Sequence, residues 1–436
     1  MQADTQANYA SAALAALVRR VTLRFMPLIM VSYFFAYFDR INIGFAKAAL
    51  QADLTLSNTA YGLGASLFVA GYVLFEVPSN MVLYRVGARR WIARIMISWG
   101  LATIAMMLVN QVWQFYALRF LIGATEAGFA PGVLYFLTLW FPQQFRGRIT
   151  SALFVASALS GIIGAPIAGL ILEHLDGFAG LAGWRWMFLF GGGPCLLLGL
   201  LVLMRLDDSI AQARWLSAAD KAMLDAAIGD APPDRSHSLL AALKSPGFLL
   251  LAFVYFLVLV ANYGLQFWGP DLIRTAFGGG SGRIGFLTAT PYICGAITMV
   301  VFGRLADRSG YRTPYISICM LIGGAGFAGA GAFSHSPALL MLSIAAMGMG
   351  IIAAIPLVWA LPARLLVGAG AASGIALINT LGQMGGLFSP ILIGRVKDLT
   401  GSATPALYLI GGMCVAGAVI LQLFAPHQLR AKDFGR

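Results

Sequence analysis

Apolar stretches long enough to cross a membrane recur from one end of the 436-residue chain to the other. A helix of about 20 residues spans the hydrocarbon core of a bilayer and satisfies its own backbone hydrogen bonds there. Only 11% of the residues are charged, whereas soluble proteins carry roughly 25%. We therefore predict an all-α membrane protein with twelve transmembrane helices. The predicted helices span residues 23–45, 58–84, 91–109, 114–139, 149–172, 184–204, 247–271, 284–303, 313–333, 337–361, 370–394 and 403–425.

The positive charges are distributed by membrane topology. The net charge is +12, and most of the 29 lysines and arginines fall in or beside the even-numbered connections between predicted helices and in the two terminal segments. By the positive-inside rule, these connections and both termini are cytoplasmic. We predict a multi-pass protein of the inner (plasma) membrane that contacts lipid. Since topology accounts for the excess positive charge, we predict no nucleic-acid partner.

The chain carries no recognisable catalytic or metal-binding pattern. Its four cysteines lie in predicted helices without a CxxC spacing, and its four histidines lie in predicted loops. An HExxH motif, a DxxD pair and a P-loop are all absent from the sequence. We expect neither a metal site nor a resident cofactor, and we expect that the protein is not an enzyme.

The chain divides into two halves of similar length. A polar connection, residues 207–245, separates six predicted helices from six others. GRLADRSGYR (303–312) follows the second helix of the second half, and NMVLYRVGAR (80–89) follows the second helix of the first. This repeat predicts two six-helix bundles related by an axis along the membrane normal. The predicted parts are a cytoplasmic N-terminal segment (1–22), an N-terminal bundle (23–206), a cytoplasmic linker (207–245), a C-terminal bundle (246–425) and a cytoplasmic tail (426–436).

The repeated loop has residues suited to a conformational latch. Glycines let helix ends approach closely, and arginines can bond the exposed carbonyls of a helix C-terminus. The simpler alternative is a basic turn that only obeys topology. The predicted latch residues are Gly303, Asp307, Arg308 and Gly310, with Arg89 in the first half.

GRLADRSGYR resembles the conserved loop of the major facilitator superfamily, and the layout of the chain is similar to that of its members. The resemblance implies the two-bundle fold of that superfamily and a monomer. The first-half copy departs from the pattern, because Tyr84 stands at the acidic position. GIIGAPIAG (161–169) is a second similar feature, whose small residues and proline suit a helix that bends between the halves. Tight packing alone is the alternative reading.

Four charged residues lie inside predicted membrane helices. Asp39 and Arg40 are neighbours in helix one, while Arg119 and Glu126 lie two turns apart on one face of helix four. Each charge costs at least ~2.5 kcal/mol at the bilayer centre. We therefore expect all four to face the bundle interior, with Asp39 and Arg40 pointing to different partners. A structural ion network without substrate contact is the alternative.

These charges suit the transport of an organic anion with a proton. An arginine fork can bind a carboxylate through two parallel hydrogen bonds. A buried carboxyl group has its pKa raised by desolvation and lowered by a nearby arginine, so it can exchange a proton as the cavity opens. We therefore expect a small carboxylate as substrate and a proton as coupling ion.

YFDRINIGFA, FEVPSN and LRFLIGATEAGFAPG resemble the anion:cation symporter family within the superfamily, which includes permeases for tartrate, phthalate and hexonates. The resemblance implies that Arg40 binds the substrate carboxylate. It also implies that Asp39 and Glu126 exchange protons under the influence of Arg119. Ser157 stands where carriers of polyhydroxylated acids often have glutamine, which argues against long sugar acids. The residues that the resemblance or the predicted cavity places at the substrate are Arg40, Tyr72, Trp359, Asn379, Tyr37 and Gln266.

We therefore predict a proton-coupled symporter that imports a tartrate-like hydroxy acid or an aromatic acid by alternating access. The second half contributes neutral groups such as Asn262, Tyr263 and Gln383, so we expect proton coupling in the first half. An anion exchanger or a hexonate permease of the same fold is the closest alternative. A drug exporter is disfavoured by a charged cavity, and a receptor by the short linker.

Overall fold

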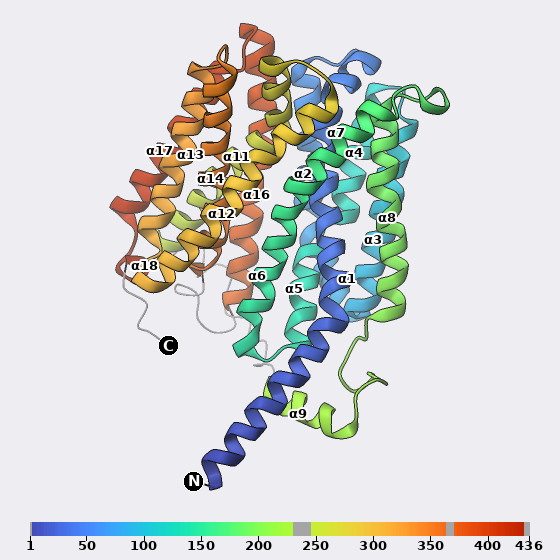
Figure 1. Cartoon of the computed structure of the whole chain (residues 1–436), viewed down its shortest axis with the longest axis vertical. Coiled ribbons are helices and arrows are strands. Elements are labelled where there is room, and N and C mark those ends of the chain that lie inside the picture. The colour runs from blue at the N-terminus through green and yellow to red at the C-terminus, as the bar shows by residue number, and fades with distance from the viewer. Residues whose placement is uncertain (1, 230–245, 363–369, 431–436) are drawn as a thin grey trace.

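The computed structural model describes residues 2–229, 246–362 and 370–430 (Figure 1). The described chain is almost entirely helical. The first half comprises α1 (Gln2–Leu54), α2 (Asn58–Val86), α3 (Ala88–Ala105), α4 (Val112–Glu126), α5 (Phe129–Trp140), α6 (Gln143–Leu159), α7 (Ala165–His174) and α8 (Gly183–Arg205). The linker contains α9 (Ala218–Ile228), and its residues 230–245 lie outside the described part. The second half comprises α11 (Pro246–Phe277), α12 (Ser281–Ser309), α13 (Thr313–Ala332), α14 (Pro337–Trp359), α16 (Gly370–Thr400), α17 (Thr404–Phe424) and α18 (His427–Arg430).

Twelve segments of the described chain are long and apolar enough to cross a membrane, which confirms the predicted fold class. Most of them match the predicted limits closely, such as Gly183–Arg205 against 184–204. α1–α8 and α11–α17 form two adjacent groups, and the start of α1 lies at the same end of the molecule as α18 (Figure 1). We call this end the termini side and the opposite end the far side.

The first helix is longer than predicted. It continues to Leu54, although Lys47 and Asp53 end the apolar stretch of the sequence. Lys47 is tolerated because its side chain is only 2% exposed and its ammonium group lies 2.8 Å from the Asp271 carboxylate. The alanine-rich segment before residue 23 extends the helix at the other end, as its high helix propensity favours.

Two predicted helices contain local breaks. The fourth span splits into α4 and α5 directly after Glu126, where Gly128 adopts a left-handed conformation with φ of +89°. The fifth span contains a π-helical segment, Ser160–Gly164, between α6 and α7. Hydropathy averages over such breaks, so the apolar pattern predicted two continuous helices.

The two halves meet mainly along α2 with α16 and α7 with α12. A Cβ added at Gly285 of α12 would lie 2.6 Å from the carbonyl oxygen of Ala165 and 3.2 Å from the Cα of Gly169. The small residues of the fifth span therefore allow its backbone to contact that of α12. The π-helical segment interrupts the regular α-helical hydrogen bonding between α6 and α7. Both features fit the expectation for GIIGAPIAG.

Polar contacts join the halves on the far side. Asp398, near the end of α16, accepts hydrogen bonds from Asn58 and Thr59 at the start of α2, at 2.6 to 3.1 Å. Asp271 of α11 binds Lys47 from the first half and Lys397 from its own half, at 2.8 and 2.9 Å. These contacts tie the two halves together on the far side in this conformation.

The predicted latch residues lie on the termini side, and none of their described bonds crosses to the other half. Gly87 and Gly310 end α2 and α12 with φ of +96° and +74°, which explains a glycine at both repeat positions. Asp307 bonds Arg312 at 2.8 Å. Arg89 lies 3.4 Å from Asp208, whereas Gly303 and Arg308 remain predicted latch members without a described bond across the halves. The latch role itself stays a prediction.

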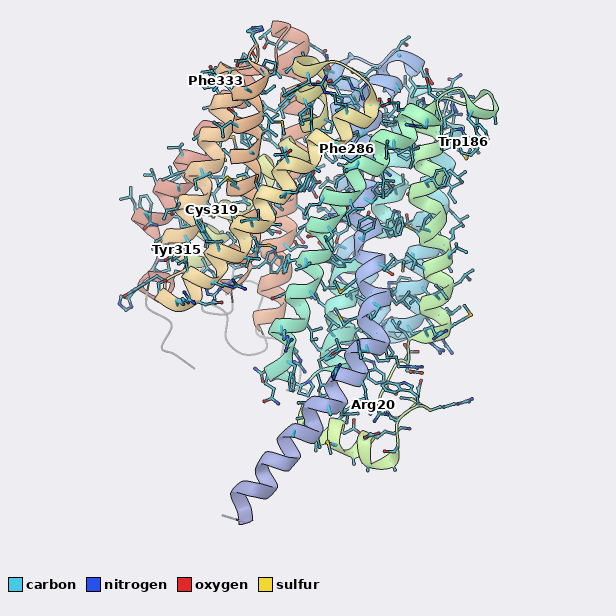
Figure 2. All side chains as sticks on the ribbon, viewed as in Figure 1. Arg20, Trp186, Phe286, Tyr315, Cys319 and Phe333 are labelled. Carbon is cyan, nitrogen blue, oxygen red and sulfur yellow. The ribbon has the colours of Figure 1, made fainter. Side chains whose placement is uncertain are left out.

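The start of the linker packs on the first half rather than forming a featureless loop. Trp215 stacks on Trp140, and Leu224 of α9 is fully buried. Arg20 of α1, labelled in Figure 2, bonds Asp220 at 3.3 Å. Figure 2 also shows apolar side chains on the outer surface, such as Phe286, which is 59% exposed. Large exposed apolar groups are expected where lipid covers a protein.

Candidate functional site

A polar cavity lies between the two halves near their middle. It is lined by residues of α1, α6, α11, α12, α14 and α16, and its volume is about 70 Å³. This volume is well below the roughly 300–1,000 Å³ of most small-molecule sites, so the cavity must widen to admit a substrate. The polar residues that line it include Tyr37, Arg40, Ser157, Asn262, Gln266 and Gln383.

Arg40 is the charged group of this cavity. Its Nε and Nη2 atoms donate hydrogen bonds to the same oxygen of Glu126, Oε1, at 3.1 and 2.5 Å. The side chains of Arg40 and Glu126 are 10% and 1% exposed. The second oxygen of Glu126, Oε2, is buried without a hydrogen-bond partner in the described structure. The arginine fork is therefore occupied by one carboxylate oxygen, and the other is free to take a proton.

The packing of α4 against α2 places Glu126 at this arginine. A Cβ at Gly123, one turn before Glu126, would lie 2.9 Å from the backbone nitrogen of Tyr72. Only glycine permits this approach of the two helices. The break after Glu126 then turns the chain into α5, so Glu126 is the last residue of α4.

Asp39 faces a different neighbour, as expected from its position next to Arg40. Its Oδ2 atom accepts hydrogen bonds from Trp99 at 3.1 Å and Thr103 at 3.3 Å, both on α3. Arg119 donates from Nε to the Gly64 carbonyl at 3.3 Å and acts electrostatically on both Asp39 and Glu126. The structure thus gathers all four predicted charges in the interior of the first half.

The residues predicted at the substrate fall into two groups. Tyr37 and Gln266 line the cavity beside Arg40, and Tyr72 lies 5.3 Å from the Arg40 guanidinium by its ring centre. Trp359 donates a hydrogen bond to the Tyr255 hydroxyl at 2.9 Å, and Asn379 donates one to Glu76 at 2.7 Å. Trp359 and Asn379 do not line the cavity in this conformation.

Sequence reasoning missed three kinds of site residue. Glu76 is buried at the contact with Asn379, although only the motif FEVPSN around it drew attention. Tyr255 lines the cavity but stands in an apolar run that gave no polar signal. Lys47 was placed in a connection and Asp271 at the end of the predicted helix 247–271, and nothing in the sequence indicates that the two residues pair across the halves. A buried acid within an apolar stretch was the available signal for Glu76.

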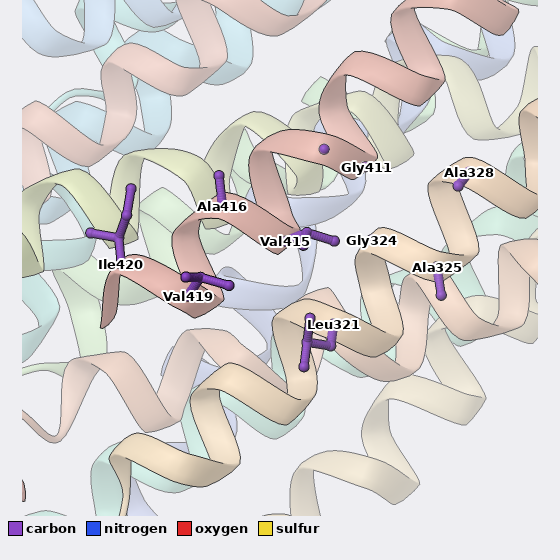
Figure 3. A pocket seen from close by; sticks show the side chains of 10 residues that line it. Leu321, Gly324, Ala325, Ala328, Gly411, Val415, Ala416, Val419 and Ile420 are labelled. Carbon is purple, nitrogen blue, oxygen red and sulfur yellow. The ribbon is translucent and has the colours of Figure 1, made fainter. Parts of the chain in front are cut away.

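A larger hollow elsewhere is unsuited to a charged substrate. It lies between α13 and α17, has a volume of about 790 Å³, and is lined only by glycine, alanine and aliphatic residues (Figure 3). Val415 and Val419 in this groove are 42% and 48% exposed on the outer surface. It offers neither charge nor side-chain hydrogen bonds, so we take it as a lipid-facing groove.

Among the described residues, no group of three histidine, cysteine, aspartate or glutamate side chains is placed to hold a metal ion.

The comparison with known families then decides the class of protein. The family model described as Major Facilitator Superfamily matches residues 29–280 and 251–433. The chain belongs to the Major Facilitator Superfamily.

The relatives of this superfamily member are transporters. It is 41% identical to a putative tartrate transporter of Agrobacterium vitis, over 96% of this chain and 93% of the relative. It is 43% identical to the putative metabolite transport protein NicT of Pseudomonas putida, over 97% and 96% of the two chains. A quinolone resistance transporter of Acinetobacter baumannii is 40% identical over 95% and 96%.

A solved structure of a D-xylose-proton symporter covers 93% of this chain and 98% of its own, with a TM-score of 0.76 and 16% identity. At that identity the likeness shows the fold, which is the predicted one. The superfamily member is a multi-pass membrane transporter and not an enzyme, which confirms both predictions at that level.

Proposed function

We propose that this transporter is a proton-coupled symporter that imports a small organic carboxylate, either a tartrate-like hydroxy acid or an aromatic acid, by alternating access. The observation that carries the proposal is the buried Arg40, whose two donors meet one oxygen of Glu126 in a cavity of otherwise neutral groups. The name of the putative tartrate transporter supports the hydroxy-acid class.

Proton binding and anion binding are coupled because Glu126 and the substrate carboxylate compete for the same arginine, Arg40. While Glu126 is ionised, its Oε1 atom accepts from Nε and Nη2, which form the side of the Arg40 fork that faces it. A proton on the free Oε2 atom removes the negative charge, and the Arg40 fork then becomes available for the substrate carboxylate. Deprotonation of Glu126 restores the ion pair and expels the anion. Asn262 and Gln266 provide neutral hydrogen-bonding groups for the rest of the substrate.

We propose that the termini side faces the cytoplasm and that the membrane is the inner (plasma) membrane. Arg20, Arg89 and Arg308 lie on the termini side, in line with the positive-inside rule. The far side is closed by the contacts of Asp398 and Asp271. The described conformation is then one that releases substrate to the cytoplasm, after which the far side must open for the next carboxylate.

Substitution of Arg40 tests the substrate assignment. We expect Arg40→Ala to weaken carboxylate binding by about 10- to 100-fold, since a hydrogen-bonded charge contributes roughly 1.5–3 kcal/mol. Uptake of radiolabelled tartrate, phthalate, nicotinate and hexonates into liposomes, and their binding by calorimetry, would measure the effect. Arg148→Ala is the matched control, because it removes an exposed arginine. Unchanged carboxylate uptake by Arg40→Ala would refute the assignment.

Export is the second candidate function, since one relative carries the name quinolone resistance transporter. An anion exchanger and a hexonate permease are further candidates of the same fold. Liposomes separate these candidates. With an inward proton gradient, a symporter accumulates the acid inside the liposomes. An exchanger transports labelled acid only when acid is present on both sides. A proton-driven exporter moves its substrate outward, in the direction opposite to proton flow.

A further inference from the structure

Glu76 is a buried acid that the proposed coupling of Arg40 and Glu126 does not use. It lies on α2 and is 5% exposed. Its Oε1 atom accepts a hydrogen bond from the Asn379 amide at 2.7 Å, and Oε2 lies 3.3 Å from the Thr380 hydroxyl. Both partners are on α16, in the other half of the molecule. Glu76 therefore makes a polar contact between the two halves.

This carboxyl group lacks the cationic partner that Glu126 and Asp271 have, and in this respect it resembles Asp39, which bonds only Trp99 and Thr103. Glu126 pairs with Arg40, and Asp271 pairs with two lysines. In the described part of the chain, no lysine, arginine or histidine nitrogen lies within 4.0 Å of Glu76. An ionised carboxylate that is buried with only neutral partners is expensive, and uptake of a proton relieves the cost.

The other titratable groups near Glu76 lie on α2 itself and on the helices around it. Arg40 of α1 lies within electrostatic range of Glu76, and Tyr72, one turn earlier on α2, lies within range of the Glu76 carboxyl group. Tyr255 and Tyr263 of α11 also interact with its charge. α4 carries Arg119 and Glu126, which pair elsewhere, while α16 presents only the neutral Asn379 and Thr380.

The position of Glu76 along α2 connects it to the opening of the two halves. It lies 18 residues from Asn58, about 27 Å along the helix from the far-side contact. It also follows Tyr72 by one turn, so it lies just beyond the arginine cavity toward the termini side. A change at Glu76 would act on the contact between α2 and α16 at this level.

We propose that Glu76 is a third proton-binding group of the transport cycle and that its proton holds α2 against α16. This inference rests on the proposed proton coupling. In the protonated form, the new O–H group on Oε2 donates to the Thr380 hydroxyl, while Oε1 still accepts from Asn379. When the halves part on the termini side, the proton passes to water there and the ionised carboxylate stays hydrated. Protonation from water re-forms the contact.

Infrared difference spectra test the protonation directly. The full-length protein in lipid nanodiscs is titrated with pH, and the carboxylic C=O band is compared among wild type, Glu76→Gln and Glu126→Gln. We expect Glu76→Gln to remove one titrating band that Glu126→Gln retains. If Glu76→Gln removes no band, Glu76 does not exchange a proton and the inference fails, while loss of a different band in Glu126→Gln leaves the proposed coupling intact.

The same spectra distinguish a proton from a metal cation. Titrations are repeated with sodium and with choline as the only added cation. A Glu76 band that responds to sodium and not to pH would overturn the inference in favour of a cation site. If neither variant removes a titrating band, the inference and the proposed proton coupling both fail.

Distances between spin labels test the effect on the two halves. Labels at Arg85→Cys of α2 and Arg304→Cys of α12 report separation on the termini side, in a chain whose four native cysteines are replaced. Glu126→Gln and Asp39→Asn are included in all samples, so that the pH responses of those two groups are absent. We expect the distance to depend on pH with Glu76 present and not with Glu76→Gln. A pH response that survives Glu76→Gln would contradict the proposed contact.

Discussion

At the scale of single residues, neighbours in the chain have different partners in the fold. Asp39 bonds Trp99 and Thr103 of α3, while Arg40 bonds Glu126 of α4. Consecutive residues of a helix point about 100° apart, so this divergence follows from helix geometry. The result is one arginine paired with an internal carboxylate, beside a second acid that is held by neutral donors, and in the proposed cycle that arginine exchanges Glu126 for the substrate carboxylate.

Replacing Glu126 by glutamine separates binding from coupling. Glu126→Gln keeps the shape of the side chain but cannot ionise, so Arg40 stays available for substrate and the proton that Glu126 would bind is not carried. We expect accumulation driven by a pH gradient to fall at least about tenfold, because the variant loses an ion pair worth roughly 1.5–3 kcal/mol whose protonation drives the cycle. Exchange of labelled against unlabelled acid should continue. Both are measured in liposomes.

Asp225→Asn is the matched control for Glu126→Gln, because Asp225 is an exposed acid on α9. It should leave accumulation and exchange unchanged. Equal loss of both activities in Glu126→Gln would point to a structural role instead and would count against the account.

At the scale of the helices, close backbone contact is what lets the halves seal the far side. α7 meets α12 through glycines, and α2 meets α16 along much of its length. A Cβ at Gly169 would lie 3.0 Å from the Cα of Gly285 and closer still to the carbonyl oxygen of Ser281. The contact is therefore intolerant of any larger residue, and it belongs to the conformation in which the far side is closed.

A valine at Gly169 should hinder closure of the far side. Overpacking typically costs about 1–3 kcal/mol, so we expect uptake to fall by about tenfold while helix content is retained. Gly412→Val is the matched control, since a Cβ at that exposed glycine meets nothing within 4 Å. Uptake rates and circular dichroism of the two variants are compared. Normal transport by Gly169→Val would show that this contact is not needed.

The sequence predicted helices and charges well, and it predicted breaks and partners poorly. Twelve apolar stretches identify the helices because the bilayer sets their length. The breaks at Gly128 and Ser160–Gly164 depend on local backbone geometry, to which hydropathy is insensitive. Charges in apolar stretches are conspicuous, so Asp39, Arg40 and Glu126 were found. Contacts such as Glu76 with Asn379 join residues 303 positions apart, and no local pattern reveals them.

At the scale of the whole molecule, the polar contacts at the far side join the two halves, as the proposed alternating access requires of one conformation. Asp398 ties α16 to the start of α2, and Lys47 ties α1 to α11. The bonds of Asp307 and Arg89 on the termini side stay within single halves. One end is thus joined across the halves in this conformation, and transport requires that end to open.

Locking the far side should stop transport. In a chain without native cysteines, Thr59→Cys with Asp398→Cys replaces a contact of 2.6 Å between the native side chains by a disulfide. We expect uptake to cease on oxidation and to return on reduction. Each single cysteine variant is the control and should transport in both conditions. Continued accumulation by the fully cross-linked protein would show that the far side does not need to open.

The central claim is that one buried arginine couples a carboxylate to a proton. Its most direct test is the internal pH of liposomes that contain the purified protein and receive tartrate, phthalate, nicotinate or a hexonate from outside. The account predicts that at least one of these acids acidifies the lumen in wild type, but not in Arg40→Ala or in protein-free liposomes. Exchange of labelled acid without any pH change, in wild type, would contradict proton coupling and make the protein an anion exchanger.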